Sequence, residues 1–107
     1  MIRHIVFFTA KKAEDVGAIA EGLQMLAGIP HSEVFEVTVN AKVDVLGNDV
    51  DVVVYAEFAD QEALDAYKRH PIYAETIAQV RPLRELRLSA DIPAQVSSHR
   101  EARKGVA

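Results

Sequence analysis

The 107-residue chain contains no cysteine and no tryptophan. Without cysteine, a disulfide framework, a thiol nucleophile and a thiolate metal site are all excluded. A domain of this length buries only about 60–70% of its unfolded surface, so oligomerisation is the obvious remaining source of extra stability. A lack of cysteine also fits a reducing compartment, and we expect a cytoplasmic protein.

Long apolar runs are missing as well. The apolar stretch at the N-terminus ends after Phe8, and Lys11-Lys12 follows almost at once. That stretch is too short for the hydrophobic part of a signal peptide, and no segment approaches the ~20 apolar residues that cross a bilayer. We therefore expect no membrane partner.

Basic residues are outnumbered, with 12 Lys and Arg against 16 Asp and Glu, and aromatic residues make up only 7% of the chain. Three of the basic residues lie after Pro93, so the preceding part is still more acidic. An acidic body with few aromatic residues lacks the electrostatic footprint of a nucleic-acid-binding protein.

Signals for metals and phosphates are also absent. The four histidines show no metal-ligand spacing, the glycines form no phosphate-binding loop, and there is no Gly-x-Ser-x-Gly motif. We expect no metal site and no cofactor. His31 and His99 are expected in a loop and in the C-terminal tail, and His70 is expected either to cap backbone amides or to pack at the corner between two helices.

What the chain does have is regular periodicity. Residues 2–9 are rich in β-branched and aromatic side chains and predict a strand. Both of its faces are apolar, which predicts a central position in a sheet. One face carries His4, Val6 and Phe8, and the other carries Ile5 and Phe7.

Three further strands are predicted. Residues 35–45 alternate apolar and polar side chains, which indicates a long half-buried strand with a bend or bulge midway. Gly47-Asn48-Asp49 is typical of a turn, so residues 50–58 should complete an antiparallel hairpin. Residues 86–92 alternate in the same way and predict the last strand.

Helical periodicity appears between the strands. Apolar residues recur every three or four positions from residue 14 to 27, and Gly28 is expected to cap that helix at its C-terminus. Asp60 is a predicted N-cap for a short helix through Lys68. His70-Pro71 should end that helix and open another, which Arg81-Pro82 ends.

The predicted order is β-α-β-β-α-α-β, an α+β ferredoxin-like arrangement with a four-stranded antiparallel sheet and helices over one face. The uncovered face would still carry apolar side chains from two strands, and packing against a second copy is the simplest way to cover it. We expect one domain at residues 1–93 and a disordered tail at 94–107. The side chains on the uncovered face are Ile5, Phe7, Val53 and Tyr55.

Three segments resemble the stress-responsive A/B barrel (Dabb) family. They are the opening residues 2–8, the stretch from Glu57-Phe58 through residues 62–67, and His70-Pro71. The resemblance implies a homodimer whose sheets face each other as an α/β barrel, with a small cavity between helices and sheet in each subunit.

Plant polyketide cyclases of that family use histidines and a tyrosine in this cavity for an aldol condensation. Their first-strand histidine matches His4, and their helix tyrosine matches Tyr67. Val52 and Tyr73 stand where two more of their histidines would be. The resemblance thus makes His4 and Tyr67 candidate catalytic residues, whereas the residues alone are more typical of a packed core.

Strand and helix periodicity points a set of side chains toward the expected cavity. Three functions are then open: a dimeric binder of a small, mostly apolar molecule; a cofactor-free enzyme, either a cyclase or isomerase or a small monooxygenase; or a structural, stress-associated oligomer. Whether the protein is an enzyme is left open at this point. The expected ligand-binding residues are His4, Val6, Val52, Val54, Tyr67, Tyr73 and Ile77.

Overall fold

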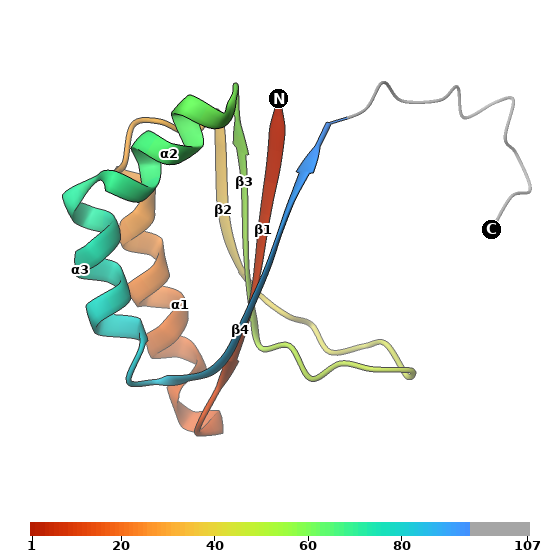
Figure 1. The fold of residues 1–107 in the computed structure, drawn as a ribbon. Helices are drawn as coiled ribbons and strands as arrows, with labels where there is room; N and C mark the ends of the chain where they lie inside the picture. The colour runs from red at the N-terminus through yellow and green to blue at the C-terminus, as the bar shows by residue number, and fades with distance from the viewer. Residues whose placement is uncertain (95–107) are drawn as a thin grey trace, which may run out of the picture.

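The computed structural model describes residues 1–94, which form a four-stranded antiparallel sheet with all helices on one face (Figure 1). The predicted α+β ferredoxin-like fold is confirmed, whereas the predicted tail from residue 95 onward lies outside the described residues. No helix in the described part is long and apolar enough to cross a membrane. The elements are β1 (Ile2–Ala10), η1 (Ala13–Asp15), α1 (Val16–Gln24), η2 (Met25–Gly28), β2 (Val34–Val39), β3 (Val52–Phe58), α2 (Gln61–Arg69), α3 (Pro71–Val80) and β4 (Arg84–Pro93).

The sheet has the strand order β2-β3-β1-β4. The first strand is central, as its two apolar faces predict, and it pairs antiparallel with β3 and β4. In this register His4 lies opposite Ala56 on one side and Asp91 on the other. Directly opposed residues point to the same face, so the strand pairing decides which side chains meet beneath the helices.

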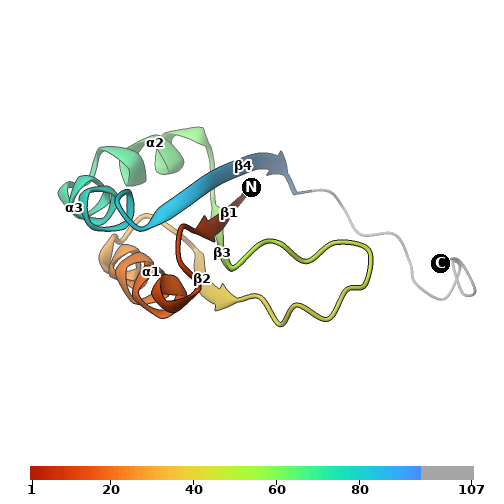
Figure 2. The ribbon, with the colours of Figure 1, turned by 90° about the horizontal axis from the view of Figure 1, so that it is seen from below.

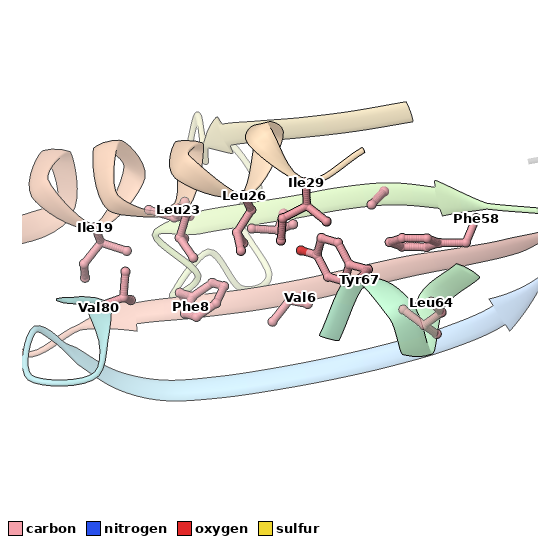
Figure 3. Close-up of a cluster of buried hydrophobic side chains, with 13 residues drawn as sticks. Val6, Phe8, Ile19, Leu23, Leu26, Ile29, Phe58, Leu64, Tyr67 and Val80 are labelled. Atoms are coloured by element: carbon pink, nitrogen blue, oxygen red, sulfur yellow. The ribbon is translucent and has the colours of Figure 1, made fainter. Parts of the chain in front are cut away.

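The hydrophobic core lies between the sheet and the helices. The even-numbered side chains of β1 and β3 point toward the helices; those of β3 and the middle three of β1 are buried, and α1 contributes Ile19 and Leu23. Figure 3 shows these side chains in a layer between the sheet and α1, with Tyr67 and Leu64 of α2 at one end and Val80 of α3 at the other.

Polar side chains cap the N-termini of the two short helices α2 and α3. Asp60 precedes α2, and its Oδ1 accepts a hydrogen bond from the Ala63 N–H at 2.9 Å. His70 ends α2 and caps α3, because its Nδ1 accepts a hydrogen bond from the Ile72 N–H at 3.2 Å. Pro71 occupies the first position of α3, where its missing N–H costs nothing. Both predicted caps are confirmed.

The first helix differs from its prediction in its last turn. The α-helix ends at Gln24, and a 3₁₀ turn continues to Gly28, so the C-cap residue is Ile29 in an extended conformation. Gly28 packs closely, because a Cβ there would come within 3.2 Å of the end of the Ile72 side chain, tighter than an ordinary contact. The glycine therefore allows this turn to approach α3 closely.

The long hairpin predicted from residues 35–58 is wrong in its middle. The second strand ends at Val39, and residues 40–51 form an irregular loop. Asn40 turns the chain there: its Nδ2 donates to the Val50 carbonyl at 2.7 Å, its Oδ1 accepts from the Lys42 N–H, and Lys42 has a positive φ of 55°. Figures 1 and 2 show the loop projecting away from the helices, so apolar side chains such as Val45 remain 96% exposed.

The second face of the sheet carries no helix (Figure 2). The register places Val53, Phe7 and Leu88 in one row across three neighbouring strands, with Ile5 and Tyr55 beside them. Phe7 is 37% exposed and Leu88 60% exposed in the single chain. The predicted bare apolar face is therefore present, and β4 extends it further than the sequence pattern indicated.

Candidate functional site

A cavity of about 370 Å³ lies between the sheet and the helices. This volume is within the range of small-molecule sites, roughly 300–1,000 Å³. Its inner wall is apolar, and its polar groups come from strands β1 and β4 and from helices α2 and α3. The lining residues are His4, Val6, Phe8, Leu23, Leu26, Val54, Tyr67, Lys68, Tyr73, Thr76, Ile77, Val80, Arg81, Arg84 and Arg87.

Six of the seven residues that the sequence assigned to ligand binding lie on this wall. The seventh, Val52, lies outside it: it is fully buried next to Phe8 in the strand pairing and does not reach the cavity. The six are His4, Val6, Val54, Tyr67, Tyr73 and Ile77.

The aromatic rings of the site pack edge to face. The ring centroid of Tyr67 lies 6.1 Å from that of His4 and 5.4 Å from that of Tyr73, with interplanar angles of 69° and 71°. Phe58 supports Tyr67 from the other side at 4.9 Å. Figure 3 shows the Tyr67 hydroxyl oxygen pointing away from Phe58. Edge-to-face packing of this kind is favourable and restricts ring movement.

His4 is held by a partner that the sequence did not reveal. Its Nδ1 contacts the Asp91 carboxylate on β4. A carboxylate only accepts hydrogen bonds, so Nδ1 carries the proton, and Nε2 of the neutral ring is left as an acceptor. Within residues 1–94 no protein group hydrogen-bonds Nε2. The imidazole is therefore fixed in one tautomer, with its basic nitrogen unused.

Burial sets the protonation state of this histidine. His4 is only 2% exposed, and burial lowers its pKa below the ordinary value of 6.5, although the hydrogen bond to Asp91 opposes this change. Lys68 and Arg87 lower the pKa further through their positive charges. The ring is therefore neutral at pH 7, as a general base must be.

The pKa of Tyr67 is shifted in the opposite direction from that of His4. Burial raises the pKa of its phenol, the neighbouring Tyr73 raises it further, and Arg87 opposes the rise. The hydroxyl therefore stays protonated at all physiological pH values. It is a hydrogen-bond donor in the cavity wall, and the residue is 1% exposed overall.

Two further features of the wall were missed by sequence reasoning. Thr76 of α3 is 1% exposed, and its Oγ1 has no hydrogen-bond partner among the described residues. Lys68, Arg81, Arg84 and Arg87 also line the cavity. The helical stripe that predicted Tyr73 and Ile77 also contains Thr76, but nothing local distinguishes it from a core threonine.

The other histidines lie away from the cavity. His31 is an exposed loop residue whose ring lies 6.2 Å from that of His70, and His99 lies outside the described residues. Residues 1–94 contain no group of three or more His, Asp or Glu side chains arranged to hold a metal ion.

The family model for the stress-responsive A/B barrel domain matches residues 2–94, which is nearly all of the described chain. The chain belongs to the Dabb family. No curated protein matches the sequence, so the comparisons give no activity to this Dabb domain directly.

Solved structures share its fold. A Dabb family protein from Mesorhizobium loti is 27% identical, with 89% of this chain and 97% of that chain covered and a TM-score of 0.72. A dimeric ferredoxin-like protein of unknown function from Thermobifida fusca is 22% identical, with coverages of 87% and 90% and a TM-score of 0.73. A structure described as an antibiotic biosynthesis monooxygenase is 15% identical, with coverages of 90% and 100% and a TM-score of 0.73.

The lowered pKa of His4 predicts a pH-dependent stability. Below about pH 6.5 the unfolded chain binds a proton at this histidine and the folded chain does not. The free energy of unfolding therefore falls as pH drops from 6.5 toward the lower folded-state pKa, and this contribution is fully present above 6.5. Urea titrations at pH 7.5 and pH 5.5 measure the free energy of unfolding. Its decrease between the two pH values should be larger for wild type than for His4→Gln.

The exposed loop variant His31→Gln is the control and should follow wild type at both pH values. Equal losses in wild type and His4→Gln would contradict a neutral, buried His4.

Proposed function

We propose that this Dabb domain is a homodimer that binds one small, mostly apolar molecule in the cavity of each subunit. The observation that carries the proposal is the cavity itself: an apolar pocket of about 370 Å³ on which polar groups with unused hydrogen-bonding capacity converge. A filled core at this place would have favoured a purely structural oligomer.

The composition of the wall supports a ligand of this kind. Val6, Val54 and Ile77 offer an apolar surface for the body of a molecule, while Tyr67 offers a hydrogen-bond donor and His4 an acceptor. Sites for small molecules typically combine a large apolar area with a few such orienting groups. Thr76 adds a buried hydroxyl that has no hydrogen-bond partner among the described residues. A buried hydroxyl without a partner is costly unless water or ligand bonds to it.

A neutral aromatic probe tests for the binding site. N-phenyl-1-naphthylamine should bind with increased fluorescence, and Ile77→Trp should weaken binding about tenfold or more, because the larger side chain occupies the cavity. Ala78→Trp, at the next position on the exposed side of α3, is the matched control and should bind like wild type. A folded wild-type protein that does not bind the probe would support the structural oligomer instead.

Dimerisation follows from the bare face of the sheet. The row of Val53, Phe7 and Leu88 is apolar across three strands, and contiguous exposed apolar patches on soluble proteins often mark interaction sites. Related structures are described as dimeric. A second copy of the same face would cover the row through a two-fold interface.

Light scattering tests the assembly state. Wild type should give about twice the 11.8 kDa mass of one chain. Leu88→Lys should give a monomer with a lower melting temperature, since the charge is placed in the interface. Ala78→Lys, on the exposed side of α3, should stay dimeric. A stable wild-type monomer, or a dimeric Leu88→Lys protein, would contradict an interface on this face.

A second function is favoured by the contact between His4 and Asp91. A neutral imidazole with Nδ1 fixed by a carboxylate presents Nε2 as a base. If the ligand carries a carbonyl, Nε2 accepts the proton from the adjacent carbon, the C–H electron pair forms the enolate, and the Tyr67 O–H donates to the enolate oxygen. Return of the proton from Nε2 to another atom of the ligand completes an isomerisation. For a cyclisation, the enolate carbon instead attacks a second carbonyl, whose π electron pair moves to its oxygen, and the proton on Nε2 passes to that alkoxide, which restores the neutral imidazole.

Hydrogen–deuterium exchange tests this chemistry without knowledge of the natural substrate. The methyl protons of 2-acetylnaphthalene in D₂O should exchange faster with wild type than in buffer, as followed by NMR. His4→Gln should remove roughly 100-fold or more of any acceleration, and Asp91→Asn should reduce it because the tautomer is no longer fixed. His31→Gln is the control. An acceleration that survives His4→Gln would exclude His4 as the base.

A further inference from the structure

The wall of the cavity is positively charged although the protein is acidic. Four of the twelve Lys and Arg residues of the chain line it, whereas none of the Asp and Glu residues within residues 1–94 does. The four come from three parts of the fold: Lys68 lies in the last turn of α2, Arg81 follows α3, and Arg84 and Arg87 lie on β4. A random distribution of charge would have placed mostly carboxylates here.

A β-bulge brings two of these side chains to the same face. Residues three apart on a regular strand point to opposite faces. Here Phe8 pairs with Arg87 and Ala10 pairs with Arg84, so β4 uses one residue more than β1 between these pairs. The Leu86 N–H donates to Thr9 Oγ1 at 3.0 Å within the bulge. Bulges commonly redirect side chains near sites, and this one directs both arginines to the cavity.

Within residues 1–94, no carboxylate pairs with these positive charges. The described residues contain two ion pairs, His4 with Asp91 and Lys42 with Asp51, and neither involves these four residues. Arg84 and Arg87 are half-buried, whereas Lys68 and Arg81 are exposed. The charges therefore lie where the apolar cavity meets solvent.

We propose that the ligand of this cavity is an amphipathic anion, an apolar body carrying one carboxylate or similar oxyanion that Arg84 and Arg87 bind at the mouth. The inference rests on the proposed function, because it specifies the class of molecule in the same cavity. Guanidinium groups bind planar oxyanions through paired, charge-assisted hydrogen bonds. The apolar wall around Val6 and Ile77 then holds the body of the ligand.

This arrangement also fits the groups deeper in the cavity. An anion held by β4 leaves the body of the molecule against the apolar wall and lets a neutral polar group at its far end reach His4, Tyr67 and Thr76, which carry no net charge at pH 7. Arg87 is close enough to both rings to affect their pKa values. Burial is the main cause of the lowered pKa of His4, and the charge of Arg87 lowers it further. Burial also raises the pKa of Tyr67, and the charge of Arg87 opposes that rise. The charged mouth and the neutral interior therefore belong to one site.

A pair of probes of the same shape tests the charge preference. 2-Naphthoate and 2-naphthamide differ chiefly in the charge of the head group, and calorimetry at pH 7.5 in low salt measures the affinity of each. Wild type should bind the naphthoate about tenfold more tightly than the amide. Added sodium chloride should weaken naphthoate binding and leave amide binding nearly constant.

Variants identify the residues responsible. The double substitution Arg84→Gln with Arg87→Gln should reduce naphthoate affinity to that of the amide, about tenfold, with little change for the amide. Arg69→Gln is the matched control, because Arg69 neighbours Lys68 at the end of α2 but does not line the cavity. It should leave the ratio of the two affinities unchanged.

The outcomes separate this inference from the proposed function. If N-phenyl-1-naphthylamine binds in the cavity but naphthoate and naphthamide bind equally, the cavity site stands and the anion preference is wrong. A naphthoate preference that persists in the double variant also overturns it, since other groups would then hold the anion. If none of the three probes binds, both proposals fail.

Discussion

The structure depends on the position of β1 as a central strand that is hydrogen-bonded along both of its edges. It pairs with β3 and β4, and its side chains divide the molecule into two halves. His4, Val6 and Phe8 point into the space beneath the helices, while Ile5 and Phe7 point to the bare face. A shift of one residue in its register would exchange these two sets. The cavity and the proposed interface therefore both depend on the register of β1.

The same pairing brings together the polar groups of the site. Asp91 reaches His4 because β4 runs antiparallel to β1 in this register, and the bulge near Leu86 turns Arg84 toward the side that Arg87 already faces. The helices complete the wall with Tyr67, Tyr73 and Thr76. A neutral base, a phenol donor and a positive mouth are thus contributed by elements that are far apart in the chain, which is typical of sites built on a rigid sheet.

Predictions from local sequence patterns were wrong at two places, one where tertiary contacts are missing and one where they are unusually close. The alternation of residues 35–45 is that of a strand, yet beyond Val39 no helix covers its apolar side and the chain turns at Asn40. Strand propensity reflects packing against a half-buried surface, so the pattern alone did not extend the strand. Similarly, Gly28 resembles a helix cap, but its small size serves the close approach of Ile72.

The sequence by itself determined the number and order of the strands and α-helices, the central strand, the caps at Asp60 and His70 and the bare apolar face, because these depend on periodicity and on short-range hydrogen bonds. Strand parity and helix stripes also directed six of the seven predicted residues to the cavity wall. Only the tertiary structure decided that Val52 is sealed in the core, that Asp91 holds His4, and that four basic residues gather at the mouth. Those features depend on strand register and on one extra residue in β4, which no local pattern of side chains encodes.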